Sequence, residues 1–112
     1  MNFIEFVEEN YLELCKLIVG KTHQAFGLLC TRIQDYPVNS VDLSQNCRAY
    51  LQKNLEINSK TNLSKIFREL KDKDLLRPIP SEPGLYMINP NYVFRGKMKD
   101  YESFVDKWNQ LV

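Results

Sequence analysis

The feature that most constrains the fold is an apolar stripe within residues 60–73. Four large apolar side chains recur there at i, i+3, i+4 and i+7: Leu63, Ile66, Phe67 and Leu70. This is the spacing of an amphipathic helix with one buried face. Because the stripe faces the core, the remaining side chains point away from it. The pattern therefore predicts a helix, Lys60–Lys73, that buries one face and exposes a polar, cationic one.

Segments on both sides of this helix predict one small domain of helices and short strands. Helical spacing predicts further helices over residues 3–19, 22–34, 44–54 and 100–111. Composition predicts a short strand over 38–41 and two more over 76–80 and 85–88, around the turn-forming residues 81–84. A chain of 112 residues has the length of a single domain. We expect N-terminal helices (1–34), a helix-turn-helix (42–73), a wing (75–97) and a C-terminal helix (100–112).

The order of these elements predicts an α+β fold that is mainly α with a small β-hairpin wing. Two short helices joined by a tight turn, with a hairpin directly after the second, describe a winged helix-turn-helix. Many such motifs place glycine at the turn, where this chain has Glu56. A left-handed residue other than glycine costs roughly 1–2 kcal/mol, so we expect a turn that is longer than standard or differently shaped.

Charge is distributed unevenly along the chain, although its net value is only +1. Residues 1–46 carry six acidic and three basic side chains, whereas residues 47–79 carry eight basic and four acidic ones. Residues 80–112 carry four of each. A polyanion responds to the local field more than to the total charge. The distribution therefore favours a basic binding face around the predicted helix-turn-helix.

Three segments between Val41 and Lys97 resemble a known family. They are Ile57-Asn58-Ser59-Lys60-Thr61-Asn62-Leu63-Ser64-Lys65-Ile66, Leu70-Lys71-Asp72-Lys73-Asp74-Leu75-Leu76, and Gly84-Leu85-Tyr86-Met87-Ile88-Asn89-Pro90 continuing to Phe94-Arg95-Gly96. They are similar to the turn and recognition helix, the helix end and the last strand of the RepL-type winged-helix replication initiators of Gram-positive plasmids. The last segment, with its Asn-Pro…Arg-Gly tail, is the most specific part. The resemblance covers about half the chain and implies a plasmid or phage protein acting in replication initiation or copy control.

The function predicted from these observations is sequence-specific binding of double-stranded DNA. An α-helix fits the major groove, where cations and hydroxyls can reach phosphates and base edges. The candidate contacts of the recognition helix are Ser59, Lys60, Thr61, Ser64, Lys65 and Arg68. The candidate contacts of the wing are Arg77, Arg95 and Lys97. Two alternatives are a dimeric transcriptional repressor and a centromere-binding segregation adaptor, and a third is a winged helix that binds only protein.

The terminal helices predict a homodimer. Their apolar residues exceed what one core of this size readily hides, and exposed apolar patches mark interfaces. The candidate dimerisation residues are Phe3, Phe6, Tyr101, Phe104, Trp108 and Leu111. A replication or segregation protein is a further possible partner.

Nothing in the sequence predicts an enzyme, a metal site or a cofactor. The three cysteines are widely spaced and His23 stands alone, so no zinc-ligand pattern is present. Free thiols are typical of a reducing compartment, which favours the cytoplasm. The amino-terminal segment lacks the pattern of a signal peptide, and no apolar run is long enough to span a membrane.

Overall fold

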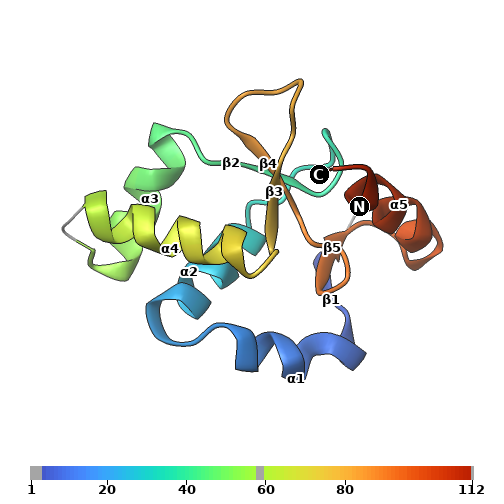
Figure 1. The fold of residues 1–112 in the computed structure, drawn as a ribbon, viewed down its shortest axis with the longest axis horizontal. Coiled ribbons are helices and arrows are strands. Elements are labelled where there is room, and N and C mark those ends of the chain that lie inside the picture. The colour runs from blue at the N-terminus through green and yellow to red at the C-terminus, as the bar shows by residue number, and fades with distance from the viewer. Residues whose placement is uncertain (1–3, 58–59, 112) are drawn as a thin grey trace.

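The computed structural model describes residues 4–57 and 60–111, which form five α-helices, one 3₁₀ turn and two small antiparallel sheets (Figure 1). In chain order the elements are β1 (Ile4–Phe6), α1 (Glu8–Leu17), α2 (Gly20–Cys30), β2 (Ser40–Asp42), α3 (Gln45–Leu55), α4 (Lys60–Asp72), β3 (Leu76–Pro78), β4 (Leu85–Ile88), β5 (Val93–Arg95), η1 (Met98–Asp100) and α5 (Tyr101–Gln110). The mixed helical and β character predicted from the sequence is confirmed. Among the described residues, no helix has the length and apolar character needed to cross a membrane.

Helix α2 lies at the centre and packs against both α3 and α4 (Figure 1). Its buried side chains include Phe26 and Leu29, which meet Leu51 of α3 and Leu63 of α4 in one apolar cluster. Burying these faces together stabilises short helices that would be marginal alone. Helix α2 begins at Gly20, two residues before the start predicted from the sequence.

Strands β2, β4 and β3 form the larger sheet, in that spatial order. Val41 pairs with Tyr86, and Arg77 pairs with Met87, so the central strand β4 is antiparallel to both neighbours. Residues 79–84 close the hairpin between β3 and β4, with the Ile79 amide donating to the Leu85 carbonyl at 3.0 Å. The hairpin predicted from residues 76–80 and 85–88 is therefore present, next to α4 in the chain.

The second sheet corrects two expectations. Residues 4–6 form strand β1 rather than the start of a helix, and they pair with β5 so that Glu5 lies opposite Phe94. Beyond the strand, the Val7 amide donates to the Tyr92 carbonyl at 2.8 Å. Because β5 pairs with β1, residues 93–97 lie outside the hairpin sheet and the predicted wing 75–97 is too long.

Asn39 connects the two sheets. It is fully buried, and its Nδ2 donates to the carbonyls of Ile88 (2.8 Å) and Val93 (3.1 Å). Its Oδ1 accepts a hydrogen bond from the Arg95 amide at 2.9 Å. One side chain thus satisfies backbone groups at the end of β4 and along β5. The backbone of Asn39 is left-handed (φ 53°), which asparagine tolerates better than most residues.

The Asn-Pro…Arg-Gly tail that carries the family resemblance holds the hairpin base and α5 together. The Asn89 side chain is buried, with Nδ2 donating to the Asp74 carbonyl at 2.9 Å and Oδ1 accepting from the Asn91 amide at 2.9 Å. A Cβ at Gly96 would lie 2.8 Å from the ring of Phe104, so only glycine fits there. These two residues of the tail therefore have a structural role in this fold.

Glu56 follows α3 in the left-handed conformation, with φ 55° and ψ 40°. This residue thus has the conformation that favours glycine, while residues 58 and 59 lie outside the described part of the chain, so the expected longer or different turn stays a prediction. The adjacent Ile57 amide donates to the Gln52 carbonyl at 3.0 Å and closes the end of α3.

We expect Glu56→Gly to raise the free energy of unfolding by about 0.5–1 kcal/mol. Glycine removes the left-handed strain, roughly 1–2 kcal/mol, but it loses more backbone entropy on folding, which offsets part of this gain. Urea denaturation of both proteins measures the difference. Glu56→Ala is the control, because it removes the charge and keeps the Cβ. Equal stability of the glycine and alanine variants would contradict the assignment of strain to this residue.

Candidate nucleic-acid interface

Helix α4 presents opposite faces to the core and to solvent, as the sequence predicts. The stripe Leu63, Ile66, Phe67 and Leu70 is buried, with exposed fractions of 8% or less. The candidate contacts Thr61, Ser64, Lys65 and Arg68 are all exposed. Lys60 begins the helix, whereas Ser59 lies outside the described residues. The structure thus groups four of the predicted contacts on one solvent-facing surface.

The exposed face of α4 is cationic. Within the described part of the chain, neither Lys65 nor Arg68 forms an ion pair, defined by a nitrogen–oxygen distance of up to 4.0 Å to a carboxylate. The nearby carboxylate of Glu69 is turned toward α2, where it accepts a hydrogen bond from the Thr22 hydroxyl at 2.7 Å. Lys65 and Arg68 are three residues apart, so their side chains share one face of the helix.

Helix α3 adds an arginine beside this face that the sequence reasoning missed. The guanidinium of Arg48 lies 4.9 Å from the centroid of the Phe67 ring, and its Nε donates to the Leu43 carbonyl at 3.3 Å. A hollow of about 270 Å³ between the two helices is lined by Gln45, Arg48, Gln52, Leu63 and Ser64. The i, i+3, i+7 spacing of Gln45, Arg48 and Gln52 places them on one face of a helix, and this pattern could have indicated Arg48 as a contact residue. Arg48 thereby extends the cationic surface of α4 across the hollow.

Arg77, a predicted wing contact, is engaged within the molecule. Its Nε and one terminal nitrogen each lie 2.9 Å from an oxygen of Asp74. Its other terminal nitrogen donates to the carbonyls of Trp108 (2.7 Å) and Leu111 (2.9 Å) at the end of α5. The guanidinium also lies 4.2 Å from the centroid of the Trp108 ring. With its donors used inside the molecule, Arg77 holds α5 against the hairpin.

We expect Arg77→Ala to lower the free energy of unfolding by about 2–3 kcal/mol, since it removes charged hydrogen bonds and a cation–π contact. Thermal denaturation followed by tryptophan fluorescence measures the loss and reports on Trp108 directly. Arg68→Ala removes the same charge from an exposed site, so its stability should stay within about 0.5 kcal/mol of wild type. If both variants were equally stable, the internal role of Arg77 would be refuted.

Arg95 is also engaged within the molecule. One terminal nitrogen donates to the Ile33 carbonyl at 2.7 Å, and Nε lies 3.2 Å from a carboxylate oxygen of Asp35. Arg95 thus anchors β5, outside the hairpin sheet, to the segment after α2, and its predicted contact with DNA stays a prediction. Lys97 is exposed, but it precedes η1 and lies outside the hairpin.

The tip of the hairpin lacks basic side chains. Residues 79–84 read Ile-Pro-Ser-Glu-Pro-Gly and contain a single charged group, the carboxylate of Glu82. Cations on a wing commonly follow the phosphate backbone, where a carboxylate would be repelled. The hairpin tip therefore adds no positive charge to the surface formed by α3 and α4.

The aromatic residues of α5 close the core of a single copy. Phe104 and Trp108 are 9% and 2% exposed, and the Phe104 ring lies 6.0 Å from that of Phe94. Both rings are thus buried within one copy of the chain, whereas the sequence analysis placed them in a dimer interface. Tyr101 and Leu111 are half-buried. Phe6 is 45% exposed, and Phe3 lies outside the described residues.

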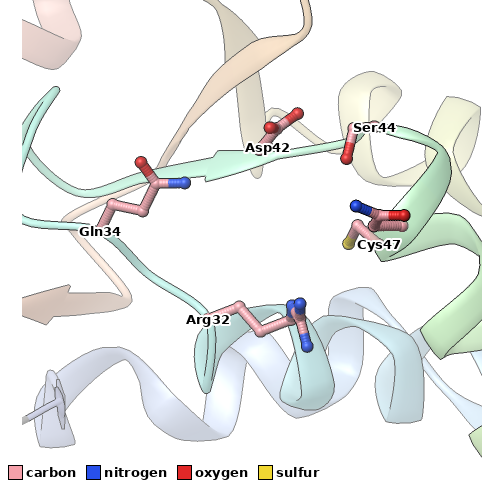
Figure 2. Close-up of a pocket in the computed structure, with 6 residues that line it drawn as sticks. Arg32, Gln34, Asp42, Ser44 and Cys47 are labelled. Carbon is pink, nitrogen blue, oxygen red and sulfur yellow. The ribbon is translucent and has the colours of Figure 1, made fainter.

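A second hollow, of about 390 Å³, lies between the end of α2, strand β2 and the start of α3. Figure 2 shows the side chains of Arg32, Gln34, Asp42, Ser44 and Cys47 around it. Arg32 and Asp42 place opposite charges on its rim, so it offers no single charge with which to select a charged ligand. The Arg32 guanidinium lies 4.4 Å from the ring centroid of Tyr50.

The cysteines are free thiols. Burial raises the pKa of Cys30 to about 12, and burial is also the main cause of the raised pKa of Cys47. Both are therefore protonated near neutral pH and poor nucleophiles. Cys15 is half-buried, with its Sγ 4.0 Å from Nε2 of His23. Over residues 4–57 and 60–111, no group of three His, Cys, Asp or Glu side chains is arranged to hold a metal ion.

Comparison with known proteins gave no match to a protein family, to a curated protein or to a solved structure.

Proposed function

We propose that this chain binds double-stranded DNA as a winged helix-turn-helix protein, with α4 as the recognition helix. The observation that carries the proposal is the two-sided character of α4. Its apolar stripe fixes the helix on α2, and its opposite face exposes Thr61, Ser64, Lys65 and Arg68. These side chains offer the donors that phosphates and base edges accept.

The arrangement around α4 supports the same proposal. Residues 56–59 separate α3 from α4, with Glu56 left-handed at the end of α3, and a β-hairpin follows α4 directly (Figure 1). A helix followed by a tight turn, a second helix and a hairpin is the element order of a winged helix-turn-helix. The 13 residues of α4 make a helix about 20 Å long, enough to lie in a major groove.

In this proposal the two helices share the contacts. Arg68 and Lys65 meet the groove, and Arg68 has the fork that can pair with both acceptors of a guanine. Arg48, held in place by the Phe67 ring and the Leu43 carbonyl, contacts the phosphate backbone beside the groove. Because the hairpin tip has no cation, it contributes little to affinity.

The biological setting is proposed from the sequence resemblance alone. A plasmid or phage protein of the RepL type would use this surface at a replication origin, in initiation or copy control. A winged helix that binds only protein is the second candidate, and the carboxylate at the hairpin tip favours it.

A binding selection from random duplexes tests the proposal. The purified chain should enrich one sequence family, and a footprint on DNA flanking its own gene should protect a matching segment. A chain that retains no duplex above background would refute DNA binding and leave the protein-binding candidate.

A further inference from the structure

Helix α1 has an outward line of side chains that no part of the described chain covers. Glu8, Leu12 and Lys16 are spaced by four residues, so they follow one line along the helix. All three are exposed, and Leu12 keeps 67% of its surface. The opposite side of α1 carries Leu14, which is 1% exposed and is the residue of this helix buried in the core. In Figure 1, α1 lies along the lower edge of the molecule.

The two ends of this line, Glu8 and Lys16, lie at equal spacing from Leu12 and carry opposite charges. Leu12 is at its centre, with an acid four residues before it and a base four residues after it. The acids Glu8 and Glu9 occupy the first turn of α1, and Lys16 occupies the last. A second copy of α1 laid antiparallel would place Leu12 against Leu12 on the two-fold axis. The same arrangement would place the acids of each copy beside the Lys16 of the other.

We propose that α1 is a self-association surface, at which two copies of this chain pair through antiparallel α1 helices. The charges on this line favour the antiparallel direction, since a parallel pair would oppose Glu8 to Glu8 and Lys16 to Lys16. Glu13, the remaining acid of α1, lies about 100° around the helix from Leu12 and off the line. A two-fold axis through Leu12 also makes the interface self-complementary, as closed dimers require. Tyr11, 42% exposed and packed edge-on against Phe6, widens the apolar area beside the axis.

This interface differs from one built by α5, whose aromatic rings are already buried. Two ten-residue helices give a small contact area, so the dimer should be weak and its population should rise with protein concentration. The inference does not depend on DNA binding, because it concerns a different helix and is tested without DNA.

Sedimentation equilibrium over a rising concentration series measures the association. We expect a monomer–dimer equilibrium in the wild type and a dimer weakened about tenfold or more in Leu12→Glu, which sets two carboxylates on the axis. Glu102→Lys on α5 is a surface control and should dimerise as the wild type does. Circular dichroism confirms that each variant is folded. A monomer at every concentration, or a dimer unaffected by Leu12→Glu, would overturn the proposal.

A charge exchange tests the pairing of the end charges, and its single variants also test the direction of the pair. Lys16→Glu alone, and Glu8→Lys with Glu9→Lys alone, should each weaken the dimer because like charges then meet at both ends. Mixing these two proteins should restore association as a heterodimer, since each acidic end then faces a basic one. Lys107→Glu on α5 matches the first charge change at a distant site and should have no effect. Failure of the mixture to associate would overturn the antiparallel arrangement.

Discussion

Asn39→Ala should lower the free energy of unfolding by about 4 kcal/mol, a large share of the stability of a small domain. The substitution removes three hydrogen bonds, two to the carbonyls of Ile88 and Val93 and one from the Arg95 amide. Because Asn39 is fully buried, water cannot replace them without opening the structure. Urea denaturation followed by far-ultraviolet circular dichroism measures the loss.

Two further variants isolate its cause. Asn39→Gly keeps a residue suited to positive φ but loses the same hydrogen bonds, so it should be nearly as destabilised as the alanine variant. Asn54→Ala removes an exposed asparagine whose Nδ2 donates to the Tyr50 carbonyl, and should cost under about 1 kcal/mol. Full stability of Asn39→Gly would show that backbone strain, rather than the connection between the sheets, explains the result.

The double variant Lys65→Ala with Arg68→Ala should weaken duplex DNA binding about 100-fold at moderate salt, if DNA binding is the function. Lys65 and Arg68 carry the positive charge at the centre of the exposed α4 face, and neither side chain is buried in the core. Fluorescence anisotropy with the selected duplex measures the change. Melting temperatures of both proteins should be nearly equal.

Two controls separate charge from geometry. Lys107→Ala removes a cation from α5, at the other end of the molecule from α3 (Figure 1), and should leave affinity unchanged. Arg68→Lys keeps the charge but not the bidentate fork, so affinity should fall less than discrimination between bases. Equal binding by the double variant and the wild type would place the DNA contacts elsewhere or exclude them.

The sequence predicted those parts of the fold that local periodicity determines. The stripe Leu63, Ile66, Phe67 and Leu70 defined the length and orientation of α4, and with it the exposure of Lys65 and Arg68. The hairpin was predictable because proline and glycine mark the turn between its strands.

The pairing of β1 with β5 could not be predicted from local patterns. Each strand has three residues, too few for alternation to be distinguished from helical spacing, and the strands lie about ninety residues apart in the chain. The internal contacts of Arg77 and Arg95 were missed for a related reason. Their partners include backbone carbonyls of Trp108 and Ile33, and a carbonyl acceptor has no signature in the amino-acid sequence.

The salt dependence of DNA binding tests the central claim most directly. For the wild type, log affinity should fall linearly with log salt concentration, because each phosphate neutralised by a lysine or arginine releases counterions. The slope should decrease by about one unit for each phosphate-contacting cation removed from α4, and should not change in Lys107→Ala. A folded wild-type protein with no salt-dependent affinity for duplex DNA would contradict the account, as would identical slopes for the wild type and the Lys65→Ala, Arg68→Ala double variant.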